Sequence, residues 1–237
     1  MLMEIGFDQC VGDEGCFTLR QHDSRKNCKT EAIIGTHVDD MLAVGPPVAL
    51  DKAESGIEGT VELDKRGKPT KMLGRMELTW EQDQVILTQT SLIESLAKQH
   101  LMKERLPQLK TSGDPSTHGK GSSIPQNPKL YEQEEDTADQ KTFQSIVGGL
   151  LFVARMSRPE ISVPTNLLGR RASKPEPSNL QAPRQLLEYL YSTRYEGIIL
   201  RKPVNLDLRI YADAKYGGEK AKSQTGVLIT LGQQSVG

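Results

Sequence analysis

The chain has 237 residues, of which 36% are hydrophobic and 5% are aromatic, and its 30 basic residues nearly balance its 31 acidic ones. This balance excludes a protein that is basic throughout but not a local basic patch. The longest run of apolar residues and glycine, 146–154, is too short to cross a bilayer, and the first ten residues lack a signal-peptide pattern. Three cysteines fit reducing conditions, so we expect an intracellular protein, cytoplasmic or nuclear, with no membrane partner.

The N-terminal part of the chain predicts strands and two hairpins. Residues 31–45, EAIIGTHVDDMLAVG, have two apolar arms around Asp39-Asp40, and this acidic pair suits the turn of a hairpin. A short helix is expected from about Val48 to Ile57. A second hairpin is expected between Lys71 and Thr88, where an alternating segment, a polar turn and a second apolar segment follow one another.

A helix and a linker are predicted next. Ser91 and Glu94 match a capping box, which predicts a helix that ends near Met102. Residues 103–138 are rich in Pro, Gly, Ser and Thr and contain the acidic run Glu132–Asp136. A segment of this length without periodicity predicts a linker or a mobile loop.

The C-terminal part predicts three helices followed by strands. Apolar residues fall at helical spacing over 143–151, a second helix is expected between Pro159 and Ala172, and a third is expected from Ser178. After Tyr195 the segments GIILRK, LRIYAD and TGVLITLG favour strands. The fold class expected from the whole pattern is α+β.

Asp39-Asp40 is the sharpest candidate site on residue type alone. Two carboxylates in a tight turn between apolar strands need a cation if they are hidden from water. Mg²⁺ prefers carboxylate oxygens, and such a site suits phosphoryl transfer by two metal ions. An Asp-Asp pair is also a common solvated turn, and spacing alone favours that second interpretation.

The cysteines do not predict a zinc site. Cys10, Cys16, His22 and Cys28 are spaced at six-residue steps, and none of them forms the close pair that a zinc knuckle needs. Buried or merely tolerated thiols are the preferred interpretation.

Six sequence blocks, in order along the chain, carry a family resemblance. They are IGFDQCVGDEGCFTL, THVDDMLAVG, KMLGRMEL with VILTQTSLIESLAKQHLM, FQSIVGGLLFVARMSRPEIS, RQLLEYLYST and LRIYADAKYGGEKAKSQTGVLITLG. THVDDMLAVG is similar to the YVDD hairpin of reverse transcriptases. The ordered set resembles the Pol polyproteins of copia-type LTR retrotransposons over nearly the whole chain except the linker. Together the blocks are specific, although each alone is weak.

The resemblance implies a domain organisation. It implies the C-terminal part of a polymerase palm at 1–88, a thumb-like helix at 89–102, a flexible linker at 103–138, a helical thumb and connection at 139–196, and the first strands of an RNase H-like domain at 197–237.

The resemblance also implies catalytic carboxylates and partners. Asp39 and Asp40 would bind Mg²⁺, with Mn²⁺ as an alternative, and Asp213 would be the first acidic ligand of an RNase H site. The first polymerase Asp, the fingers and the remaining RNase H ligands are not matched, so we expect the chain to be inactive alone as an RNA-directed DNA polymerase. The implied partners are an RNA/DNA primer–template, deoxynucleotides and the rest of the Pol polyprotein.

Two groups of basic residues predict a nucleic-acid surface. Residues 98–129 hold six bases and two acids, net +4, and residues 141–174 hold six bases and one acid, net +5. The resemblance implies phosphate contacts from Arg155, Arg158, Arg170 and Arg171, and it places His37, in the position of the motif's Tyr, beside the primer. A solvated helix face is the alternative for each arginine taken singly.

Two prolines leave the functional state open. Pro164 and Pro183 stand where helix-favouring residues are expected. Either they interrupt helices, as in a decayed, non-catalytic remnant with at most weak nucleic-acid binding, or each helix begins at its proline.

Overall fold

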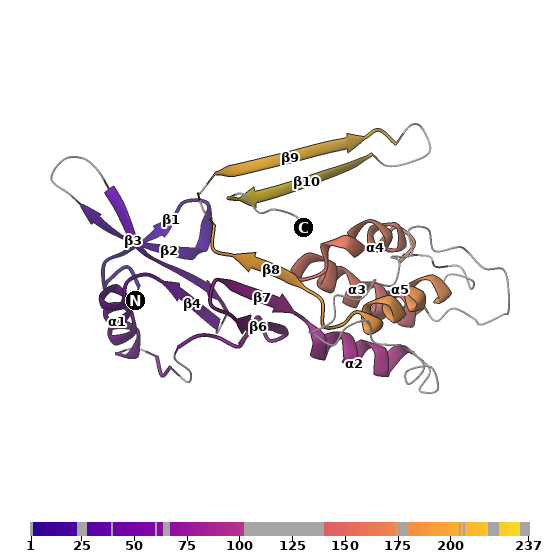
Figure 1. Ribbon diagram of the computed structural model, residues 1–237, viewed down its shortest axis with the longest axis horizontal. Coiled ribbons are helices and arrows are strands. Elements are labelled where there is room, and N and C mark those ends of the chain that lie inside the picture. The colour runs from indigo at the N-terminus through magenta and orange to yellow at the C-terminus, as the bar shows by residue number, and fades with distance from the viewer. Residues whose placement is uncertain are drawn as a thin grey trace. The chain divides into compact units, whose positions relative to one another are not determined.

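The computed structural model describes residues 2–22, 28–38, 40–59, 61–63, 67–101, 140–173, 175, 180–203, 205, 207–217 and 223–232. Over these ranges the chain is mixed α+β, as the sequence predicts (Figure 1). It divides into two compact units, Met1–Leu78 and Thr79–Gly237. The predicted linker 103–138, with its acidic run, lies outside the described residues, as do Asp39 and Lys174.

The first unit is a four-stranded antiparallel sheet with one helix. The strands β1 (Phe7–Cys10), β2 (Asp13–His22), β3 (Cys28–His37) and β4 (Asp40–Val44) lie in that order in the sheet. Helix α1 (Pro47–Glu58) follows, which confirms the helix expected at 48–57. Phe7, Ile34 and Ala53 are almost completely buried in one cluster, so apolar residues of the sheet pack against apolar residues of the helix.

A second antiparallel sheet has the order β5 (Lys71–Met72), β6 (Met76–Trp80), β7 (Gln84–Thr88), β8 (Ile198–Arg201). The predicted hairpin between Lys71 and Thr88 is confirmed, since its turn falls between β6 and β7. Strand β8 pairs with β7 from Gln84 opposite Arg201 to Leu87 opposite Ile198. A Cβ atom at Gly197 would lie 2.0 Å from the Leu87 carbonyl oxygen, so only glycine fits directly before β8.

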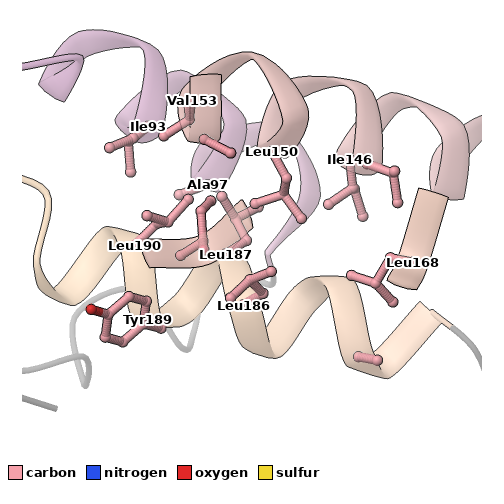
Figure 2. Packing of buried hydrophobic residues seen from close by; sticks show 14 of the residues in the cluster. Ile93, Ala97, Ile146, Leu150, Val153, Leu168, Leu186, Leu187, Tyr189 and Leu190 are labelled. Carbon is pink, nitrogen blue, oxygen red and sulfur yellow. The ribbon is translucent and has the colours of Figure 1, made fainter. Parts of the chain in front are cut away.

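The helices of the second unit share one apolar core. They are α2 (Thr90–His100), α3 (Gln140–Met156), the 3₁₀ turn η2 (Pro159–Ile161), α4 (Ser162–Gly169) and α5 (Gln181–Ser192). Figure 2 shows Ile93 of α2, Leu150 of α3 and Leu187 of α5 in this core, and none of the three is solvent-exposed. Burying each such side chain contributes about 1.5–3 kcal/mol, so this core is the main source of stability in the unit.

The predicted capping box is wrong. Helix α2 begins at Thr90 with Gln89 at the N-cap position, so Ser91 lies inside the first turn and not before it. Gln89 is fully buried and accepts a hydrogen bond from Ser157 Oγ at 2.8 Å, which ties the start of α2 to the residue after α3.

The two prolines fit neither of the predicted alternatives. Pro164 and Pro183 are each the third residue of their helices, α4 and α5, and both are buried. The first four N–H groups of a helix have no acceptor within the helix, so proline at this position removes no helical hydrogen bond. The prolines therefore give no support to a decayed fold.

Strands β9 (Leu208–Lys215) and β10 (Gln224–Leu231) confirm two of the strands expected after Tyr195, and they pair in antiparallel fashion. Apolar side chains on both strands are exposed, among them Ile210 and Ile229. Within the described ranges, no helix combines the length and apolar character needed to span a bilayer.

Candidate metal and nucleic-acid site

The β3–β4 hairpin places Asp40 directly after its turn. His37 pairs with Asp40 as the last pair of the two strands, so the turn consists of positions 38 and 39. Val38 has a φ of 54° and is 95% exposed. Two-residue hairpin turns need positive φ angles, and the apolar arms on either side set the register of the pair. The predicted hairpin is confirmed, while the carboxylate of Asp39 lies outside the described residues.

The Asp40 carboxylate is held by a second turn of the same unit. Its Oδ2 accepts a hydrogen bond from the Leu73 backbone N–H at 2.7 Å, and the side chain is half-buried. Leu73 has a φ of 51° and Gly74 a φ of 65°, so two successive residues adopt the left-handed conformation to present this N–H group. A carboxylate has about four lone-pair sites, so Asp40 retains acceptor capacity for a cation.

His37 and Asp40 are the described residues of the hairpin that could face a ligand. His37 is exposed opposite Asp40, where a nucleic acid could reach its ring. Within the described part of the chain, no three His, Cys, Asp or Glu residues come together as a metal site. A cation at this hairpin would therefore depend on Asp40 together with Asp39.

Asp213 lies on strand β9 of the second unit, opposite Gly226 of β10. Its side chain is exposed, and Oδ1 accepts a hydrogen bond from the Ala214 backbone N–H at 2.9 Å. The described residues bring no further carboxylates to it as a metal-binding group. Its predicted role as a metal ligand stays a prediction.

Three of the four predicted phosphate-binding arginines are exposed. Arg155 lies in the last turn of α3, and Arg170 and Arg171 directly follow α4. The Gln144 side chain of α3 donates a hydrogen bond to the Ala172 carbonyl at 2.8 Å, which fixes the segment after α4 against α3. The arginines after α4 are therefore carried on the same helix pair as Arg155.

Arg158 is not on this surface, and its predicted phosphate contact is wrong. Only 1% of the residue is exposed. Its guanidinium donates to the Thr193 carbonyl at 2.8 Å and to the Thr193 hydroxyl at 2.7 Å. It also forms ion pairs with Glu160 at 2.5 Å and Glu196 at 3.6 Å, and it lies 5.6 Å from the centre of the Tyr189 ring.

The buried guanidinium has a structural function. Thr193 is the C-cap residue of α5, so Arg158 donates to a carbonyl at the negative end of that helix. Arg158 itself follows α3 and precedes Pro159, the first residue of η2. One side chain therefore joins the end of α3 to the end of α5. The burial raises the pKa of the neighbouring Tyr189 hydroxyl, which stays protonated near neutral pH.

A second arginine, which sequence reasoning missed, joins α2 to the end of α5. Arg194 Nε donates to Glu94 Oε1 at 2.9 Å, and its guanidinium lies 4.6 Å and 4.5 Å from the ring centres of Tyr191 and Tyr195. The Thr90 hydroxyl donates to the Arg194 carbonyl at 2.9 Å. The spacing of an arginine between two tyrosines was the available sequence signal, because aromatic faces attract guanidinium groups.

Comparisons with known proteins find relatives over nearly the whole chain. A putative transposon Ty5-1 protein of Saccharomyces cerevisiae is 28% identical over 232 residues, which cover 97% of this chain and 70% of that protein. The retrovirus-related Pol polyprotein from transposon RE1 of Arabidopsis thaliana is 27% identical over 238 residues, which cover 99% of this chain and 15% of the polyprotein. The homologues of this chain are Ty5/copia-type retrotransposon Pol polyproteins.

A third Pol relative extends the match to another plant. The retrovirus-related Pol polyprotein from transposon TNT 1-94 of Nicotiana tabacum is 27% identical over 206 residues, 84% of this chain and 15% of the polyprotein. The chain therefore spans a small part of the plant Pol polyproteins that it matches. No protein-family model matches it, and no solved structure matches it significantly.

The structural role of Arg158 in this Pol-related chain predicts a stability effect. Arg158→Ala removes the bonds to Thr193 and the ion pairs, and we expect a loss of about 2–3 kcal/mol in the free energy of unfolding. Arg155→Ala is the matched control, because it removes an exposed arginine from the same segment and should change stability by no more than about 0.5 kcal/mol. Urea unfolding followed by circular dichroism measures both. Equal losses in the two variants would contradict the structural role.

Proposed function

We propose that this Pol-related chain supplies the metal-binding hairpin of a reverse transcriptase. The observation that carries the proposal is the β3–β4 hairpin, in which Asp40 heads a strand directly after a two-residue turn that contains Asp39. Two carboxylates adjacent in sequence at a hairpin turn match the hard oxygen ligands that Mg²⁺ and Mn²⁺ prefer. The relationship to retrotransposon Pol polyproteins makes RNA-directed DNA synthesis the reaction in which such a hairpin would serve.

The surroundings of Asp40 fit this role. The Leu73 N–H fixes one carboxylate oxygen, so a cation would meet a group that is already oriented. A bound divalent ion would stabilise charge on the phosphate oxygens of a nucleotide. His37, exposed beside the same turn, would contact the primer.

The proposal assigns the parts of the chain as follows. Residues 1–88 form part of a polymerase palm, 89–102 and 139–196 form thumb and connection around the linker 103–138, and 197–237 begin an RNase H-like domain in which Asp213 is a metal ligand. The α2–α5 core supports an independently packed helical part, and the exposed apolar side chains of β9 and β10 suit a sheet that continues in a larger domain.

Loss of both hairpin carboxylates should weaken Mn²⁺ binding at this turn. We expect Asp39→Asn combined with Asp40→Asn to raise the Kd for Mn²⁺ about tenfold or more, because a neutral amide is a poor ligand for a hard cation. The free-Mn²⁺ electron paramagnetic resonance signal, titrated against the protein, measures this Kd. Asp83→Asn is the control, since Asp83 is an exposed carboxylate beside another hairpin turn and should leave the Kd unchanged. Identical binding by all three proteins would refute the hairpin site.

A second candidate function is non-catalytic nucleic-acid binding through the helical part. It is favoured by the exposure of Arg155, Arg170 and Arg171 on the α3–α4 pair. Arginine is suited to phosphate because its planar fork donates two parallel hydrogen bonds. Binding of this kind would follow the nucleic-acid backbone and show little sequence preference.

Replacing these three arginines should weaken binding to an RNA–DNA duplex. We expect the triple alanine variant to lose affinity and to flatten the dependence of log K on log salt by about one unit for each phosphate contact removed. Fluorescence anisotropy at several salt concentrations measures both quantities. The control replaces Arg75, Arg201 and Arg209 by alanine, which changes the net charge equally at exposed sites on strands and turns. If both variants lose the same affinity and slope, the α3–α4 arginines are ordinary solvated side chains.

A further inference from the structure

Cys10 and Cys16 face each other across the β1–β2 hairpin. Phe7 pairs with Leu19, Asp8 with Thr18 and Gln9 with Phe17. The register then shifts so that Cys10 pairs with Asp13, which leaves residues 14–16 as a bulge that contains Cys16. The two sulfur atoms lie 3.2 Å apart, with Cys10 Sγ as the hydrogen-bond donor.

This geometry suits a disulfide with little movement. The sulfur atoms are 3.2 Å apart, and a disulfide bond is about 2.05 Å long, so they need to approach by only about 1.2 Å. The bulge gives the short segment between the cysteines room to close that difference. Both thiols are free and half-buried. A small oxidant such as a peroxide can therefore reach them more easily than a larger thiol compound can.

We propose that Cys10 and Cys16 form a reversible oxidation site, which closes to an intramolecular disulfide when the protein meets a peroxide. A thiolate sulfur attacks hydrogen peroxide, and the O–O bond breaks to give a sulfenic acid and water. The second thiol then attacks that sulfur, the S–O bond breaks, and a second water leaves. The two sulfurs lose two electrons in total to one peroxide molecule, and an added dithiol returns them.

The contact with Cys10 and partial burial raise the pKa of the Cys16 thiol. The thiolate is the form that attacks peroxide. The two sulfurs lie in contact, so whichever thiol is oxidised first has the other beside it to resolve the sulfenic acid.

The disulfide would act on the sheet that carries the hairpin. Cys16 pairs with Gly35 of β3, and the adjacent Thr36 hydroxyl donates to the Gly15 carbonyl at 3.1 Å. Closing the bond restrains the start of β2 beside the part of β3 that leads to His37. The oxidation site does not depend on the proposed metal function, because it requires only the β1–β2 register.

The experiment is peroxide oxidation of the Cys28→Ser variant, which leaves these two thiols alone. We expect mass spectrometry to find that a monomer has lost two hydrogens and carries one disulfide between Cys10 and Cys16. Dithiothreitol should fully reverse this change. The further replacements Cys10→Ser and Cys16→Ser, each made in that variant, should abolish the linkage. Linkage between two chains, or separate oxidation of each thiol without linkage, would overturn the proposal.

A comparison in urea separates the folded geometry from closeness in sequence. Cysteines six residues apart can also meet in an unfolded chain. We expect the native variant to form the bond about tenfold faster or more than the same variant in urea, because the fold already holds the sulfurs in contact. A native rate equal to or below the unfolded rate would show that the β1–β2 register does not create the site.

Discussion

The helical half of the chain depends on one buried guanidinium. Arg158 follows α3, and its guanidinium donates hydrogen bonds to Thr193, the C-cap residue of α5. One side chain therefore connects the C-terminal ends of both helices. A buried charge is costly without partners, and here Thr193, Glu160 and Glu196 supply them. The burial of Arg158 also affects the proposed nucleic-acid surface, because this arginine is not available to bind phosphate. Arg155, Arg170 and Arg171 remain exposed to solvent.

A comparable but smaller constraint shapes the hairpin. The Asp40 carboxylate is bound by the N–H of Leu73, and that N–H is presented by two residues with positive φ. A leucine in this conformation costs about 1–2 kcal/mol, which the rest of the turn must offset. The bond orients a carboxylate at the tip of a sheet, where the proposed cation site needs it.

Local patterns allowed most elements to be predicted from the sequence. The 3.6-residue spacing of Phe143, Ile146 and Leu150 predicts α3, and the apolar arms around Asp39-Asp40 predict the β3–β4 hairpin. Such patterns depend on neighbours along the chain and on which face is buried. The start of α2 was misplaced because the capping-box pattern predicts Ser91 as the N-cap residue, whereas the helix begins two residues earlier, with Gln89 at that position.

The contacts that matter most for the site were not predictable from local pattern. Arg158 resembles a surface arginine until Thr193, 35 residues away, supplies buried acceptors. The hydrogen bond from the Leu73 N–H to Asp40 joins residues 33 positions apart, and the residue types alone do not predict it. The Cys10–Cys16 contact depends on the register of β1 and β2, which even spacing of cysteines does not reveal. Tertiary pairing decides all three.

The central claim is that the β3–β4 hairpin holds a divalent cation in a Pol-related protein. Anomalous X-ray scattering from a crystal grown with Mn²⁺ locates that ion directly. We expect an anomalous peak within coordination distance of carboxylate oxygens of Asp39 and Asp40, with the Leu73 N–H still bonded to Asp40. A fully occupied Mn²⁺ elsewhere in the protein, with both hairpin carboxylates bound only to solvent, would contradict the account.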